Sequence, residues 1–235
     1  MSLLAHGIGG VRDLPVPESY FYIGGSIVLV VSFLALGVLW QRPLLERNRN
    51  GRPLPNALQV VLLSRALRVL LGAISAGLLV LVIATALFGT SLELLNFAPT
   101  FVYVIFWLGL PLLSVVLGDV WRVLSPWRAI ADAFVWVFER TGRTAQPLLD
   151  PATRLGRYPA ALALFSFAAL ELAHPRPSFP RTLGVAVALY SYWALAGMAV
   201  FGRDTWTRCG EGFAVAFELL SRIAPFSLRD GKVVL

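Results

Sequence analysis

Five long apolar runs alternate with polar segments along this chain of 235 residues. Crossing a hydrocarbon layer of about 30 Å takes about 20 helical residues, each rising about 1.5 Å. The pattern therefore predicts five transmembrane helices, at 21–40, 67–88, 101–117, 158–173 and 182–201. The fourth run is the shortest and contains Glu171, and Pro111 inside the third run predicts a kink.

Two of the intervening segments carry apolar residues at three- and four-residue intervals, the spacing of an amphipathic helix. In 129–139 the side chains of Ile130, Phe134 and Val137 fall on one face. In 212–224 the same spacing ends at Pro225. We expect the first segment to be an interfacial helix on the inner membrane surface. The second is either another interfacial helix or a helix packed under the bundle.

The composition agrees with a lipid environment. Hydrophobic residues make up 57% of the chain, charged residues only 14%, and the mean hydropathy is +0.74. These values are too apolar for a soluble protein of this length. We therefore expect an all-α integral membrane protein that forms a single transmembrane domain over 1–235.

The basic residues predict the orientation, because Lys and Arg accumulate in short cytoplasmic loops. Seventeen of the 20 lie after the first run, between the third and fourth runs, or in the C-terminal tail. The N-terminus is then outside and the C-terminus inside the membrane. The net charge of +7 favours contact with anionic lipid headgroups, whereas nucleic acid is not expected as a partner.

One candidate site lies near the outer end of the fourth run. Glu171 and His174 are three residues apart, so both project from one helical face, and His6 lies on the same side of the membrane. Together they could hold a divalent metal that activates water for phosphotriester hydrolysis. The alternative is structural: His174 ends the helix, and Glu171 pairs with a nearby arginine.

A second polar cluster is expected on the inner side of the membrane. It could form a network of ion pairs that gates a path, or a docking surface, or it could simply anchor helix ends in the headgroup layer. Its members are Asp119, Arg122, Arg128, Arg203, Asp204 and Glu211.

Several local strings resemble an actinobacterial family of polytopic membrane proteins, some members of which are labelled fenitrothion hydrolase. The strings are AHGIGG, DLPVP, GDVWRVLSPWR, RLGRYPA, GMAVFGRDTW, GEGF and SRIAPF. The resemblance implies a bacterial plasma membrane, and it implies that this chain is the N-terminal part of a longer protein, because the family continues into further spans. The turn signal Asp230-Gly231 is followed by the opening of a strand-like run. This segment is either a frayed tail or the point at which a longer protein continues.

Three functions stay open from the sequence. The chain could be a membrane subunit or scaffold without chemistry of its own, which we favour. It could be a metal-dependent phosphotriester hydrolase with an outer-face site, as the family label implies. It could also be part of a proton- or ion-coupled transporter, with Glu171 as the relay.

Overall fold

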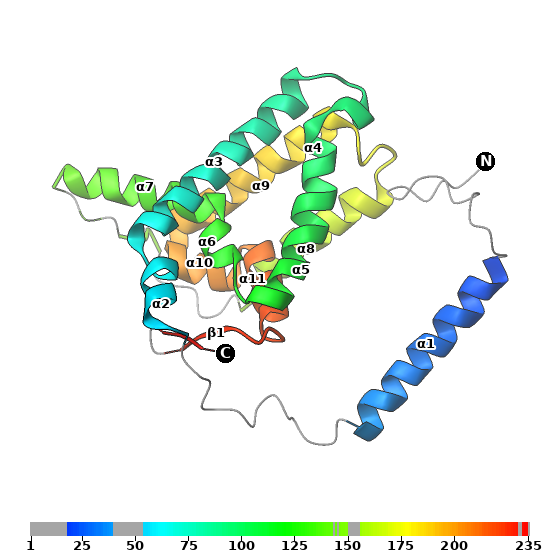
Figure 1. Ribbon diagram of the computed structural model, residues 1–235. Coiled ribbons are helices and arrows are strands. Elements are labelled where there is room, and N and C mark those ends of the chain that lie inside the picture. The colour runs from blue at the N-terminus through cyan, green and yellow to red at the C-terminus, as the bar shows by residue number, and fades with distance from the viewer. Residues whose placement is uncertain are drawn as a thin grey trace. The chain divides into compact units, whose positions relative to one another are not determined.

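The structure is a computed structural model that describes residues 18–39, 54–142, 144, 146–149, 156–229 and 232–234, and it is mostly helical (Figure 1). The chain divides into two units, Met1–Arg52 and Pro53–Leu235. In the first unit the structure describes one helix, α1 (Glu18–Leu39), which covers most of the first predicted span. The single domain predicted for the whole chain stays a prediction.

All five predicted runs are helical. In the second unit, α3 (Arg65–Phe88), the continuous helix Phe97–Leu117 and α9 (Pro180–Phe201) are long and apolar enough to cross a membrane. The shorter α8 (Tyr158–Ala173) has the predicted bounds, and its 16 residues are about 24 Å long. The Ser64 hydroxyl fixes the start of α3 by accepting a hydrogen bond of 3.1 Å from the Leu67 amide.

The helix type changes just before Pro111, where a kink is predicted; the kink itself stays a prediction. The third run begins as α4 (Phe97–Pro99), continues as the π-helix η2 (Thr100–Gly109) and ends as α5 (Leu110–Leu117). Pro111 stands in the first turn of α5, but that helix is continuous with η2, so its missing N–H leaves one carbonyl of the preceding turn without an intrahelical donor. The wider π-turns accommodate the proline without ending the helix.

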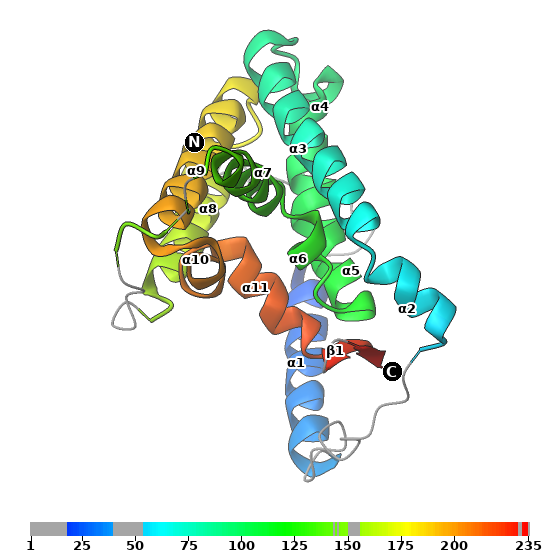
Figure 2. The same cartoon turned by 90° about the vertical axis from the view of Figure 1, so that its left-hand side faces the viewer.

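Helices α3 and α9 meet at one end and diverge toward the other (Figure 2). Where they meet, a Cβ at Gly184 would lie 2.9 Å from Ala86 Cβ and 2.8 Å from Leu87 Cδ2, so only glycine permits this approach. Where they diverge, α7 (Pro126–Arg140) contacts both helices. A Cβ at Gly72 of α3 would lie 2.8 Å from Ala129 Cβ of α7.

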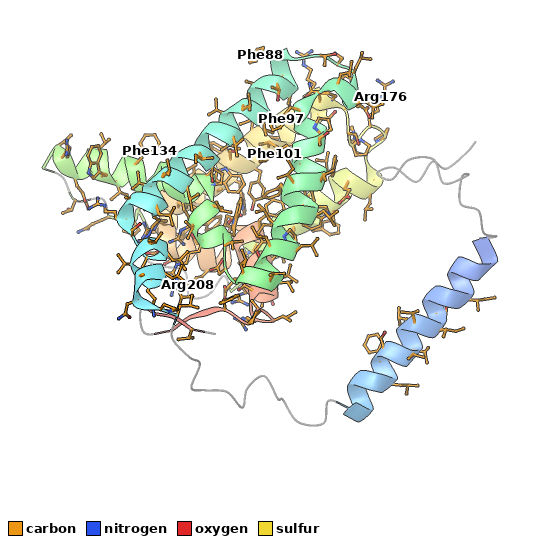
Figure 3. The ribbon with its side chains drawn as sticks, viewed as in Figure 1. Phe88, Phe97, Phe101, Phe134, Arg176 and Arg208 are labelled. Atoms are coloured by element: carbon orange, nitrogen blue, oxygen red, sulfur yellow. The ribbon has the colours of Figure 1, made fainter. Side chains whose placement is uncertain are left out.

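The far end of α7 extends away from the bundle (Figures 1 and 3). Its Phe134 side chain is 70% exposed, and the Arg140 guanidinium lies 4.0 Å from the centre of the Trp136 ring. The helix predicted at 129–139 is therefore confirmed as a helix with an exposed apolar face. Its position at a membrane surface stays a prediction.

The remaining elements are short. A β-hairpin pairs β1 (Ser227–Arg229) antiparallel to β2 (Lys232–Val234), and the Leu54 amide donates to the Val233 carbonyl at 3.0 Å. The strands flank the predicted turn Asp230-Gly231, which lies outside the described residues. The other short helices are α2 (Asn56–Leu62), η1 (Glu93–Leu95), α6 (Trp121–Leu124), α10 (Arg203–Cys209) and α11 (Gly212–Ser221).

We expect Gly184→Ala to lower the stability of the protein, because the added methyl group collides with Ala86 and Leu87. Overpacking of this kind costs about 1–3 kcal/mol. The measurement is the unfolding temperature of the purified chain in detergent. Gly77→Ala is the matched control, since a Cβ at Gly77 of α3 meets no atom within 4 Å. Equal unfolding temperatures for the two variants would contradict the close α3–α9 contact.

Candidate functional site

Helices α10 and α11 form a hairpin that turns back beside α9. The Phe201 ring stacks on Trp206 at 5.3 Å, and the Trp193 indole N–H donates to the Gly210 carbonyl at 3.1 Å. The Trp206 ring also packs on Trp193 at 5.3 Å, so α10 lies against the second half of α9. Because Gly210 is bonded to Trp193, the tip of the hairpin lies level with the middle of α9.

Glu211 occupies this tip and is fully buried. Its carboxylate accepts four hydrogen bonds. Oε1 accepts from the Tyr190 hydroxyl at 2.5 Å and from the Phe213 amide at 3.1 Å. Oε2 accepts from the Trp121 indole N–H at 3.0 Å and from the Ala214 amide at 2.9 Å. The side chain thus caps α11 and connects it to α6 and α9.

The four donors match the acceptor capacity of an ionised carboxylate, and the N-terminal end of α11 adds favourable electrostatics. Among the described residues, no arginine, lysine or histidine forms an ion pair with Glu211. Burial raises the pKa of this carboxyl, and the hydrogen bonds from Tyr190 and Trp121 act in the opposite direction. A raised pKa in the folded state means that this group contributes most to stability at low pH. That contribution is lost as the pH rises through the folded pKa.

A cavity of about 640 Å³ lies inside the bundle next to this site. Residues of α3, the Phe97–Leu117 helix, α8 and α9 form its walls, and these residues are almost entirely apolar. The wall hydroxyls of Ser75 and Ser166 are bonded to carbonyls of their own helices. The side next to the hairpin is aromatic, formed by Trp121, Trp127, Tyr190, Trp193 and Phe213.

Trp121, Tyr190 and Phe213 therefore contact both the cavity and Glu211. The Tyr190 ring packs on Phe213, and the rings of Trp121 and Phe213 both pack on Phe106 and Phe217, at centroid distances of 4.6 to 6.0 Å. Such edge and tilted contacts hold rings in fixed orientations. The carboxylate, its two side-chain donors and the aromatic wall form one continuous packed unit.

Part of the predicted inner-side cluster is brought together. Asp204 pairs with Arg128 at 3.4 Å and with Arg203 at 3.0 Å, and Arg203 also pairs with Asp132, a partner that the sequence did not predict. The hydrogen bond from Arg203 holds the pKa of Asp204 below its usual value. These pairs are partly exposed, so they contribute little to stability.

The other three members of that cluster lie apart from this network. Asp119 accepts from the Arg122 amide at 3.2 Å, a local bond at the start of α6. Glu211 is bonded to Trp121, Tyr190 and α11 instead. The segment 212–224 was predicted to be either an interfacial helix or a helix packed under the bundle. The first half of α11 is buried in the bundle, which agrees with the second alternative.

Two of the predicted outer-side residues, Glu171 and His174, lie at the C-terminal end of α8. Glu171 is half-buried on the last turn of that helix, whereas His174 follows it and is exposed. His174 directly follows α8, and its Nδ1 atom accepts from the Arg176 amide at 3.1 Å, which fits the first part of the structural alternative. Among the described residues Glu171 forms no ion pair, so the predicted pairing with an arginine is not present. His6 lies outside the described residues. Within those residues, no group of three His, Cys, Asp or Glu side chains could hold a metal ion.

The sequence carries one local signal for the buried site, the glycines on both sides of Glu211. A Cβ at Gly210 would collide with the Trp206 ring, and a Cβ at Gly212 would lie 3.0 Å from the Ala160 carbonyl oxygen. An acid between two glycines inside an apolar segment is thus the mark of a tightly packed turn. The partners Trp121 and Tyr190 come from segments 90 and 21 residues away.

The comparisons with known proteins give no relative: the chain matches no family model, no curated protein and no solved structure. The resemblance to the fenitrothion hydrolase-like family stays a prediction from the strings quoted above.

We expect Glu211→Ala to destabilise the chain by about 2–5 kcal/mol, because four buried donors lose their acceptor. Unfolding in detergent, followed by tryptophan fluorescence, measures the loss. Glu218→Ala on the same helix is the control, since Glu218 is one-third exposed and pairs at the surface with Arg222 and Arg157. A Glu211→Ala protein as stable as the control would show that the cap is dispensable.

Proposed function

We propose that this chain is a multi-pass protein of a bacterial plasma membrane that binds an apolar, membrane-soluble molecule in its central cavity. The observation that carries the proposal is the cavity of about 640 Å³. Its volume falls within the range of about 300–1,000 Å³ typical of sites for small molecules. Its apolar walls favour a ligand that partitions from the lipid.

The direction of the hydrogen bonds supports an apolar ligand over a polar one. The hydroxyls of Ser75 and Ser166 donate to their own helices, and the Trp127 indole donates to the Ser191 hydroxyl at 2.9 Å. The wall thus offers few free donors to a ligand. Aromatic rings beside the hairpin offer flat surfaces that suit a ring or an acyl chain.

The membrane topology is part of the proposal. Three helices meet the length and hydropathy of a membrane span. We infer that α1 and α8 complete five crossings, with the N-terminus outside. The end of the bundle at Arg176 would then face outward, and the end at Arg208 would face the cytoplasm (Figure 3).

The three functions predicted from the sequence stay predictions beside this one. A membrane subunit or scaffold is compatible with a ligand-binding bundle, since a bound apolar molecule can support assembly. For the hydrolase, the exposed position of His174 offers no enclosed site. For the transporter, the buried acid Glu211 is a better relay candidate than Glu171.

Filling the cavity tests the ligand proposal. Ala186 of α9 lines the cavity, so Ala186→Phe places a ring inside it. A photoactivatable diazirine-bearing fatty alcohol, added to vesicles that contain the full chain, should label Ala163 of α8 in the wild type, because Ala163 lines the cavity and is buried. We expect several-fold less labelling there in Ala186→Phe. Labelling near Val80, which is 64% exposed on α3, should not change.

Ala73→Phe is the matched control, because Ala73 is exposed on α3. It should leave the labelling of Ala163 at the wild-type level. If Ala163 is unlabelled in the wild type, or if Ala186→Phe leaves its labelling unchanged, the cavity does not take up apolar molecules and the proposal fails.

Single cysteines test the orientation. In a Cys209→Ser background, Arg176→Cys should react with a membrane-impermeant maleimide added to intact cells. Arg140→Cys, at the end of α7, should react only after the cells are permeabilised. Both residues are exposed, so accessibility within the protein is matched. The reverse pattern would invert the topology, and reaction of both in intact cells would place both loops outside.

A further inference from the structure

The four donors around Glu211 are not equivalent. The Trp121 indole N–H and the amides of Phe213 and Ala214 can only donate. The Tyr190 hydroxyl can both donate and accept, because its hydrogen rotates about the C–O bond. At three of the four contacts of the carboxylate, the neighbouring group cannot accept a hydrogen bond from an added proton. At the fourth contact, the Tyr190 hydroxyl can accept it.

This difference assigns the proton to one oxygen. Oε2 faces the Trp121 indole and the Ala214 amide, neither of which can accept a proton from it. Oε1 faces the Tyr190 hydroxyl at 2.5 Å. If the Tyr190 hydrogen turns away, the Tyr190 oxygen can accept from a protonated Oε1. The same oxygen lies 3.3 Å from the Phe213 amide, which can donate to it.

We propose that Glu211 is a proton-binding site at the tip of the α10/α11 hairpin and that Tyr190 is the positioning residue that lets the carboxyl hold the proton on Oε1. The proton comes from the solution and returns to it, so the carboxylate gains one O–H bond and loses one negative charge. Tyr190 changes only the direction of its hydroxyl. The proposal does not require a ligand in the cavity.

The surroundings of Glu211 favour a neutral form. The carboxylate is fully buried, and an unpaired charge in an apolar interior is costly. Helix α5 has no charged residue, and the titratable residues of α8 are Tyr158 and Glu171, near its two ends. The titratable and charged residues of the other neighbouring elements are Arg122 on α6, Arg181, Tyr190 and Tyr192 on α9, Arg203, Asp204, Arg208 and Cys209 on α10, and Glu218 on α11. Of these, only Tyr190 is hydrogen-bonded to Glu211.

Infrared difference spectroscopy of the full chain in phosphatidylcholine nanodiscs tests the proposal. Protonation of a buried acid produces a carbonyl stretching band that can be followed between about pH 4 and pH 9. We expect one such band in the wild type and its loss in Glu211→Gln. Glu218→Gln, the same substitution on the same helix, should leave the band in place.

Tyr190→Phe separates a proton site from a simple structural cap. The variant keeps Glu211 but removes the oxygen that accepts from protonated Oε1, so the carbonyl band should move to a higher frequency as that hydrogen bond is lost. A band that keeps the wild-type frequency in Tyr190→Phe would overturn the role of Tyr190. This variant also decides the question if Glu211→Gln does not fold.

The absence of any titrating band from Glu211 would overturn the site itself. In that case the carboxylate stays charged across the range and acts only as the cap of α11. This outcome is independent of the labelling experiment on the cavity, so the two proposals can fail separately.

Discussion

The capped carboxylate of Glu211 is the interaction on which the arrangement of the second unit depends. A charged group without a basic partner is costly to bury, and here four hydrogen bonds and the start of a helix offset that cost. The four bonds reach three elements: Trp121 belongs to α6, Tyr190 to α9, and the two amides to α11. One side chain therefore determines where three elements meet, and it does so at the level of the middle of α9.

The hairpin can reach that level only because glycine and tryptophan are paired across it. The Trp206 ring occupies the space that side chains at Gly197 and Gly210 would fill, and it stacks on Phe201 at the base of the hairpin. Such close contact contributes dispersion energy. Dispersion is important between helices in lipid, because the hydrophobic effect does not drive helices together there. The rings held in this way also form the aromatic side of the cavity, so the shape of the cavity follows from the packing of the hairpin.

The local sequence pattern was sufficient to predict the helices, but it was not sufficient to predict the site around Glu211. The apolar runs are long, so all five appear as helices, and α8 has the predicted bounds. Pro111 was expected to kink its helix, and a π-helix accommodates it, which periodicity cannot indicate. The role of Glu211 depends on Trp121, 90 residues away, and the Asp132–Arg203 pair joins residues 71 apart. No spacing along one helix encodes such contacts. The glycines beside Glu211 were visible, but without the position of α9 they indicate only a turn.

The cavity and the buried acid share Tyr190 and Trp121, which has a thermodynamic consequence. Protonation of Glu211 reverses the Tyr190 hydroxyl, and that changes the wall which a bound molecule would contact. A ligand that binds the two protonation states with different affinity must shift the proton equilibrium by the same factor. An entirely apolar ligand has little to distinguish the two hydroxyl directions, whereas a ligand with one acceptor near Tyr190 distinguishes them strongly. The degree to which binding depends on pH would therefore report the polarity of the end of the ligand that lies against the hairpin.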